Sequence, residues 1–292
     1  MKLGLGTAQF GMDYGISRPG GKTDPDEVRR VLDVAAQNHI RIVDTAALYG
    51  TSEEVLGHAL PANHGFSIVT KTPVFSGTEI TADSARLVEL SLRRSLTNMR
   101  LRAVYGLLIH HADDALAKGG NLLLEKMQEL KRRGQTQKIG VSVYRAEQID
   151  RVLDRFSIDI IQIPLNVFDQ RLLRSGHLMK LKQAGIEIHA RSVFLQGLLL
   201  MEPSSLPSYF DSIKAHLARY HEYLKNEGLT PVQGAIGFVA GLDAVDIVLC
   251  GVNNHLQLEE ICSQWKPCDA GRFSEFAVSN EGIVDPSRWK IT

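Results

Sequence analysis

The chain has 292 residues, of which 44% are hydrophobic and 23% are charged, and its 33 Lys and Arg residues balance its 33 Asp and Glu residues. This composition is typical of a globular protein, and the balanced charge argues against binding to nucleic acid or to an anionic membrane surface. No stretch approaches the ~18 consecutive apolar residues of a transmembrane helix, and the first residues lack the pattern of a signal peptide. Because three cysteines suit a reducing compartment better than a disulfide scaffold, we expect a cytoplasmic protein.

Eight segments have the apolar, mostly β-branched composition of buried strands. In chain order they cover residues 2–8, 40–44, 66–71, 103–110, 138–143, 159–165, 186–192 and 245–251. Several of them are continuous apolar runs, which indicates a parallel sheet whose two faces are both buried.

A helical pattern follows each predicted strand. In chain order the helices lie around residues 28–35, after a capping Thr51 or Ser52 up to Leu60, and at 83–99, 121–133, 146–156, 175–184, 209–226, 231–240 and 256–265. The first strand leads into a loop that runs to Asp24, so no helix is expected directly after it. No clear period is present from Lys266 onward.

Eight strand–helix units in a chain of this length predict a (β/α)8 TIM barrel that forms a single domain over residues 1–292. The stretch 193–230 after the seventh strand is too long for a plain loop, and such insertions often cover active sites. A doubly wound sheet is the alternative, but the spacing of Gly4, Gly6 and Gly11 does not match the G-x-G-x-x-G phosphate loop.

Polar residues stand where three successive strands end, and in a barrel these ends form the catalytic face. Asp44 ends the second strand with Tyr49 just beyond it, Lys71 ends the third, and His110 ends the fourth. A tyrosine hydroxyl can protonate a carbonyl oxygen, and a nearby ammonium lowers its pKa from about 10. We therefore expect Tyr49 as an acid tuned by Lys71, which Asp44 holds in place, with His110 orienting the substrate.

Each of these four residues alone also fits an ordinary structural role, such as a turn cap, a solvated lysine or a core histidine. Their occurrence together at successive strand ends is what favours catalysis. The histidines His110, His111 and His189 do not form a convincing ligand cluster, so no metal site is expected.

The chain resembles the aldo-keto reductase superfamily in motifs that occur in order along nearly its whole length. These motifs are "LGLGTAQFG" (3–11), "DTAALYGTSEEVLG" (44–57), "IVTKT" (68–72), "YGLLIHH" (105–111), "KIGVS" (138–142), "IIQIPLNVFD" (160–169), "ARSVFLQGLL" (190–199) and "VLCGVNNHLQLEEI" (248–261). The resemblance implies that Asp44, Tyr49, Lys71 and His110 form the catalytic tetrad, with Tyr49 as proton donor. It also implies hydride transfer from a nicotinamide cofactor to a small-molecule carbonyl substrate, and a sugar-derived carbonyl compound is one candidate.

The resemblance further implies a set of cofactor contacts. Ser142 and Gln162 match positions that hold the nicotinamide carboxamide, and Ser192, Leu195 and Gly197 match the loop that runs along the cofactor. The segment for the adenosine phosphate would contain Gly251, Val252, Asn253 and Gln257, although an ordinary helix start explains these residues as well. Because these last positions are uncharged, the sequence predicts use of both NADP and NAD, with NADP slightly favoured.

Two positions depart from the family pattern. Val143 stands where an asparagine is usual, and Arg191 stands where many members stack an aromatic ring on the nicotinamide. A guanidinium can stack there, or it can bind a phosphate or an acidic substrate. These departures leave open a cofactor-binding sensor or regulatory protein with little turnover as the alternative function. The sequence gives no indication of the oligomeric state.

Overall fold

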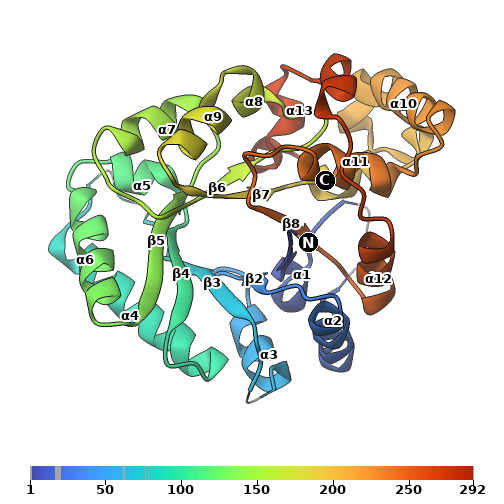
Figure 1. The fold of residues 1–292 in the computed structure, drawn as a ribbon. Coiled ribbons are helices and arrows are strands. Elements are labelled where there is room, and N and C mark those ends of the chain that lie inside the picture. The colour runs from blue at the N-terminus through green and yellow to red at the C-terminus, as the bar shows by residue number, and fades with distance from the viewer. Residues whose placement is uncertain (1, 17–20, 62, 76, 78, 292) are drawn as a thin grey trace.

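A closed barrel of eight parallel strands forms the centre of the protein (Figure 1). The computed structural model describes residues 2–16, 21–61, 63–75, 77 and 79–291. The strands are β1 (Leu3–Gly6), β2 (Ile42–Asp44), β3 (Ser67–Lys71), β4 (Val104–Ile109), β5 (Thr136–Ser142), β6 (Ile160–Pro164), β7 (Glu187–Arg191) and β8 (Ile247–Gly251). Because β1 pairs with both β2 and β8, the sheet has no free edge, and the predicted TIM barrel is confirmed over the doubly wound alternative.

The helices form a ring around this barrel (Figure 1). They are α1 (Ala8–Gly11), α2 (Pro25–Gln37), α3 (Ser52–Ala59), α4 (Ala82–Met99), α5 (Ala112–Leu116), α6 (Asn121–Arg132), α7 (Ala146–Leu153), α8 (Arg171–Arg174), α9 (His177–Gln183), α10 (Asp211–Asn226), α11 (Pro231–Ala240), α12 (His255–Ser263) and α13 (Glu281–Val284). None of the helices in the described part of the chain combines the length and the apolar character needed to cross a membrane.

The expectation that no helix directly follows the first strand is wrong, because α1 begins two residues after β1. The short helices α5, α8 and α13 also had no counterpart in the sequence analysis. A helix of one turn is too short to produce an apolar period, and its formation depends on tertiary contacts rather than on propensity.

The closed sheet has one apolar layer inside it and another outside it. Inside the barrel a small cluster contains Ile42, Val69, Leu108, Ile160 and Leu249, all nearly inaccessible to solvent. The outward-facing strand residues pack against the helices in the main core, so both faces of the sheet are buried, as the continuous apolar runs predicted.

The insertion predicted after the seventh strand is present. It contains three short 3-10 helices, Leu195–Leu200, Pro203–Ser205 and Ser208–Phe210, and then α10. Tyr220 of α10 packs edge-on against Phe273 and Phe276, which lie in the tail that showed no period. The aromatic side chains thus dock the tail onto the insertion.

Two glycines let the loop that carries Tyr49 pack directly on α1. A Cβ atom on Gly11 would lie 1.8 Å from the carbonyl oxygen of Tyr49, and one on Gly50 would lie 2.3 Å from the carbonyl oxygen of Gly11. Gly50 also has a φ of +56°, a conformation that glycine adopts without strain. The hydroxyl of Ser52 donates to the Thr7 carbonyl at 2.9 Å and holds the same two segments together.

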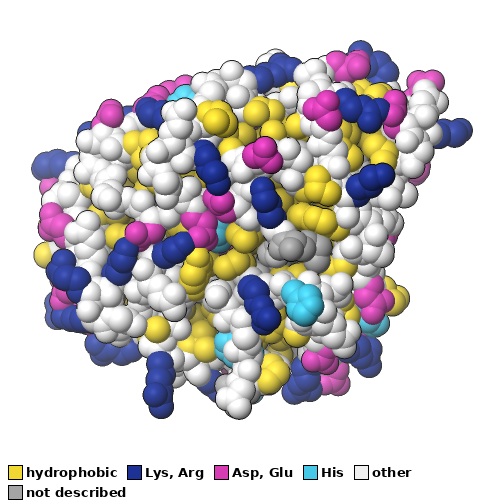
Figure 2. Space-filling model, viewed as in Figure 1, with side chains coloured by type: hydrophobic (Ala, Val, Ile, Leu, Met, Phe, Trp, Pro, Cys, Tyr) yellow, Lys and Arg dark blue, Asp and Glu magenta, His cyan; other side chains and the backbone are white. Residues whose placement is uncertain are grey.

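Charged side chains of both signs are interspersed over the face shown in Figure 2, which agrees with the balanced composition.

Candidate functional site

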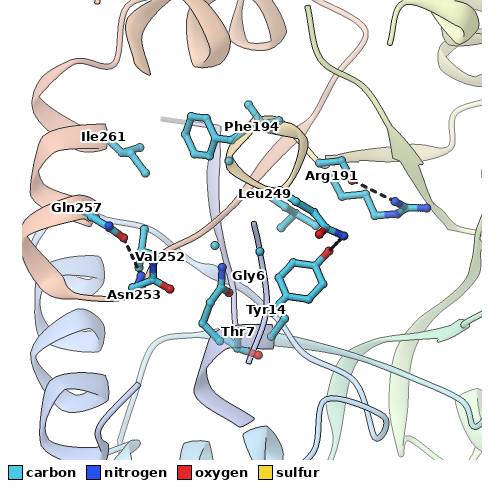
Figure 3. A pocket seen from close by; sticks show the side chains of 18 of the residues that line it. Gly6, Thr7, Tyr14, Arg191, Phe194, Leu249, Val252, Asn253, Gln257 and Ile261 are labelled. Carbon is cyan, nitrogen blue, oxygen red and sulfur yellow. Dashed lines mark hydrogen bonds between the residues drawn. The ribbon is translucent and has the colours of Figure 1, made fainter. Parts of the chain in front are cut away.

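A pocket opens at the carboxyl end of the barrel strands (Figure 3). The last residues of four strands contribute to its wall: Gly6, Asp44, Arg191 and Gly251. The loop after β1, the loop after β7 and the start of α12 complete the wall. This is the face on which barrel enzymes place their active sites.

A buried ion pair forms one side of the pocket. The ammonium of Lys71 donates to Asp44 Oδ2 at 2.6 Å and to the carbonyl oxygen of Thr45 at 2.9 Å. The amide of Gln162 donates to the other carboxylate oxygen of Asp44 at 2.7 Å. Since Lys71 is only 1% exposed, these bonds replace the water that would otherwise solvate the pair.

Tyr49 and His110 lie beside this pair, so the structure brings the four predicted catalytic residues together. The ammonium of Lys71 is 5.0 Å from the centroid of the Tyr49 ring. The imidazole of His110 lies edge-on to the same ring, with 5.9 Å between the ring centroids. The ring of Tyr49 thus contacts both a cation and an imidazole, and Tyr49 itself lines the pocket.

The pKa of Tyr49 shifts in the direction opposite to the expected one. Burial raises this pKa, and the nearby Asp44 carboxylate raises it further, while Arg191 acts in the opposite sense. The expected shift took Asp44 only as the partner that holds Lys71, and left out the direct effect of its carboxylate on the pKa of the phenol. The phenol is therefore firmly protonated at neutral pH, which suits a proton donor.

The other two titratable groups are also shifted by their surroundings. Burial lowers the pKa of Lys71, and the Asp44 carboxylate opposes that shift. Burial lowers the pKa of His110 to about 3, assisted by the positive charges of Lys71 and Arg191. His110 is therefore neutral at physiological pH and can donate or accept one hydrogen bond.

The low pKa of His110 should make the fold sensitive to acid. The unfolded chain takes up a proton at His110 near pH 6.5 while the folded chain does not, so the free energy of unfolding should fall as the pH drops from 6.5 toward 3. We expect His110→Gln to lose less stability than the wild type between pH 7.5 and pH 5, by about 2 kcal/mol. Denaturant unfolding at both pH values measures this difference, with the exposed His58→Gln as control. Equal losses in all three proteins would contradict the assignment.

Most of the predicted cofactor residues line the same pocket. They are Gln162, Arg191, Ser192, Gly197, Gly251, Val252, Asn253 and Gln257. Ser142 is buried at the end of β5 and Leu195 is buried in the core, and neither belongs to the pocket wall. Their cofactor contacts stay predictions.

The start of α12 uses its own side chains to bind its free backbone amides. Gln257 Oε1 accepts from the Asn253 amide at 2.8 Å, and Asn254 Oδ1 accepts from the Gln257 amide at 2.9 Å. Glu27, which belongs to α2, accepts from both the amide and the ring of His255, at 2.6 and 2.5 Å. Although burial alone would raise the pKa of Glu27, the bonds from His255 lower it, and the ionised carboxylate is paired with Arg30 at 3.1 Å.

Several residues of the site were missed by the sequence analysis. Tyr14, Phe194 and Glu260 line the pocket, and Tyr144 packs against Arg191 beside it. Burial raises the pKa of Tyr14 to about 12. The sequence offers little signal for these residues, because each lies in a loop or on a helix surface rather than at a strand end.

Comparisons with known proteins agree with this geometry. The sequence profile of the Aldo/keto reductase family matches residues 2–276. A NAD(P)H-dependent 6'-deoxychalcone synthase of Glycine max is 27% identical over 200 residues, which are 62% of each chain. Deoxymugineic acid synthase 1 of Oryza sativa subsp. japonica is 26% identical over 208 residues, which are 65% of this chain and 63% of that protein. The chain thus spans a little under two thirds of the length of these curated relatives.

Solved structures share the fold at lower identity. The holo form of an aldo-keto reductase from Bacillus halodurans has a TM-score of 0.76 at 20% identity, covering 99% of this chain and 95% of that one. A glycerol dehydrogenase from Gluconobacter oxydans has a TM-score of 0.74 at 21% identity, covering 98% and 92%. The eight-stranded barrel, the polar cluster at its carboxyl face and the profile that spans nearly the whole chain lead to one conclusion: the protein belongs to the Aldo/keto reductase family.

Proposed function

We propose that the protein is a NAD(P)H-dependent reductase that converts an aldehyde or ketone into an alcohol. The observation that carries this proposal is the contact of the Tyr49 ring with both Lys71 and His110, beside a buried Lys71–Asp44 pair. A module that only binds a cofactor has no need of a protonated phenol beside a buried cation. The family membership supports the reaction class, while the substrate and the cofactor remain part of the proposal.

The residues present fit a long cofactor of this type. The pocket runs from Tyr49 to Gln257, and at the Gln257 end Asn253 Oδ1 is a buried polar atom without a hydrogen-bond partner among the described residues. Nδ1 of His110, whose ring packs against Tyr49, is a second such atom. Buried polar atoms are normally paired, so a ligand is a plausible source of their missing bonds. Gln162, Ser192 and Gly251 lie between these ends on the pocket wall.

In this proposal each side chain has a defined task. A bound reduced nicotinamide supplies the hydride that adds to the carbonyl carbon. The hydroxyl of Tyr49 donates its proton to the carbonyl oxygen, and neutral His110 orients that oxygen by a hydrogen bond. Lys71 stabilises the phenolate that forms, because its charge stands 5.0 Å from the ring while Asp44 and Thr45 hold it in place.

We expect the protein to use both NADPH and NADH, with NADPH favoured by no more than about 100-fold in kcat/KM. One lost charged hydrogen bond costs about 1.5–3 kcal/mol, and the pocket wall near Gln257 contains Glu260 but no described Lys or Arg. The carboxylate of Glu27 at the start of α12, although paired with Arg30 at 3.1 Å, disfavours a 2′-phosphate more than a 2′-hydroxyl.

Steady-state kinetics with each cofactor and a panel of aldehydes, ketones and alcohols test the proposal. Glu27→Gln should raise kcat/KM for NADPH several-fold more than for NADH, whereas the exposed Glu125→Gln should change neither. A much larger preference for NADPH in the wild type would indicate a phosphate site elsewhere. Cofactor binding without turnover on any carbonyl or alcohol would instead favour the sensor function.

A further inference from the structure

Arg191 is held at the pocket wall in a defined orientation. Its guanidinium carbon lies 4.2 Å from the centroid of the Tyr144 ring, so one face of the guanidinium is stacked. Nη2 donates to the carbonyl oxygen of Val143 at 3.2 Å, and Nη1 donates to Ser192 Oγ at 3.2 Å. These contacts fix the plane of the side chain but use only two of its five N–H groups.

The charge of Arg191 is not balanced within the site. Among the described residues no carboxylate forms an ion pair with Arg191. The other cation of the site, Lys71, is paired with Asp44 at 2.6 Å. His110 is neutral, because its pKa is lowered to about 3. The catalytic end of the pocket therefore carries one uncompensated positive charge, and partly buried charges normally have a partner.

The position of this charge favours the substrate over the far end of the cofactor site. Figure 3 shows Arg191 on the side of the pocket opposite Gln257 and Asn253. The guanidinium reaches from the end of β7 to Val143 after β5, and therefore crosses the end of β6. In an eight-stranded barrel β6 stands opposite β2, the strand that leads to Tyr49, and Arg191 is close enough to lower the pKa of Tyr49.

We propose that the substrate is an anionic carbonyl compound, and that the guanidinium of Arg191 binds its carboxylate or phosphate group. This inference rests on the proposed function and adds the substrate class to it. A flat guanidinium with free N–H groups matches the two oxygens of a carboxylate or phosphate, and stacking on Tyr144 reduces the entropy lost when these bonds form. A substrate that reaches from Tyr49 across the barrel mouth to Arg191 is oriented at both ends.

The test compares neutral and anionic aldehydes of the same skeleton. The first pair is benzaldehyde with 3- and 4-carboxybenzaldehyde, and the second is glyceraldehyde with glyceraldehyde 3-phosphate. We expect the wild type to have at least about 10-fold higher kcat/KM for the anionic member of one pair. The pair that shows the larger preference distinguishes a carboxylate from a phosphate.

Arg191→Met and Arg191→Gln should lower kcat/KM for the anionic aldehyde by about 10- to 100-fold more than for the neutral aldehyde. Arg191→Lys should retain part of the preference for the anionic aldehyde, because lysine keeps the positive charge but lacks the planar guanidinium that binds two oxygens at once. Arg86→Met, which changes an exposed arginine on α4, is the matched control and should behave as the wild type. The two neutral variants differ in polarity, so if one of them misfolds, the other still tests the inference. Circular dichroism checks that each variant is folded.

A direct binding measurement separates substrate from cofactor. Fluorescence titration with NADH should give the same Kd for Arg191→Met and the wild type, whereas inhibition by benzoate should weaken in the variant. If the wild type had equal kcat/KM for the neutral and the anionic member of each pair, the inference would be overturned and the reductase function would stand. Equal losses for both substrates with weaker NADH binding would assign Arg191 to the cofactor and also overturn it. Absence of turnover with all aldehydes would overturn the reductase function itself.

Discussion

Tyr49→Phe should lower the rate of carbonyl reduction by about 100-fold or more while cofactor binding is retained. The substitution removes the hydroxyl that donates the proton but keeps the ring that packs against His110 and Lys71. Single-turnover kinetics with a good aldehyde, together with fluorescence titration of NADH, measure the two effects separately.

A matched control is available at the opposite end of the barrel. Tyr105 also carries a hydroxyl that forms a bond inside the barrel, donating to Glu187 at 2.8 Å. Tyr105→Phe should leave turnover near the wild-type value. A Tyr49→Phe enzyme that keeps near-normal turnover with several aldehydes would show that another group donates the proton.

Lys71→Met should shift the pH dependence of alcohol oxidation to higher pH and weaken the fold. Alcohol oxidation needs the phenolate of Tyr49, so its rate rises with pH through the pKa of that phenol. Without Lys71 the Asp44 carboxylate acts on Tyr49 uncompensated and raises the pKa of the phenol by about one unit or more. Breaking a buried pair also costs about 3–5 kcal/mol of stability, which denaturant unfolding measures.

Asp44→Asn should shift the same profile in the opposite direction. The variant removes the charge that raises the pKa of Tyr49, so the phenolate forms at lower pH. The exposed pair Lys180–Asp150 has the same 2.6 Å separation, and Lys180→Met and Asp150→Asn are therefore suitable controls that should not move the profile. Shifts of the same sign in Lys71→Met and Asp44→Asn would contradict this account of the electrostatics.

The barrel was predictable because each of its units is long enough to display its own pattern. The helix at Pro231–Ala240 has the predicted bounds, and Asp211–Asn226 begins only two residues later than expected. Short elements such as Ala8–Gly11 were missed, since their residues become helical through contacts with distant segments.

The same distinction separates the predicted and the missed site residues. Asp44, Lys71 and His110 stand at or just after the ends of adjacent strands, so barrel geometry alone brings them together. Glu27 reaches the site through long-range packing, for which the sequence contains no spacing rule. Tyr144 follows the end of β5 by two residues and was missed because its role depends on its contact with Arg191. The sign of the Tyr49 shift was missed for a related reason, because it depends on the balance between burial and two opposite charges.

The direct contact of Gly11 with Gly50 determines which part of the pocket can move. With backbone packed on backbone, the loop of Tyr49 cannot swing away without separating α1 from the barrel. The loop after β7 is different: Ser192, Leu195 and Gln196 have left-handed backbone conformations, which store strain, and Gln196 accepts a hydrogen bond from the Ile16 amide at 3.0 Å. We therefore expect ligand exchange to displace the loop after β7 more than the loop that carries Tyr49.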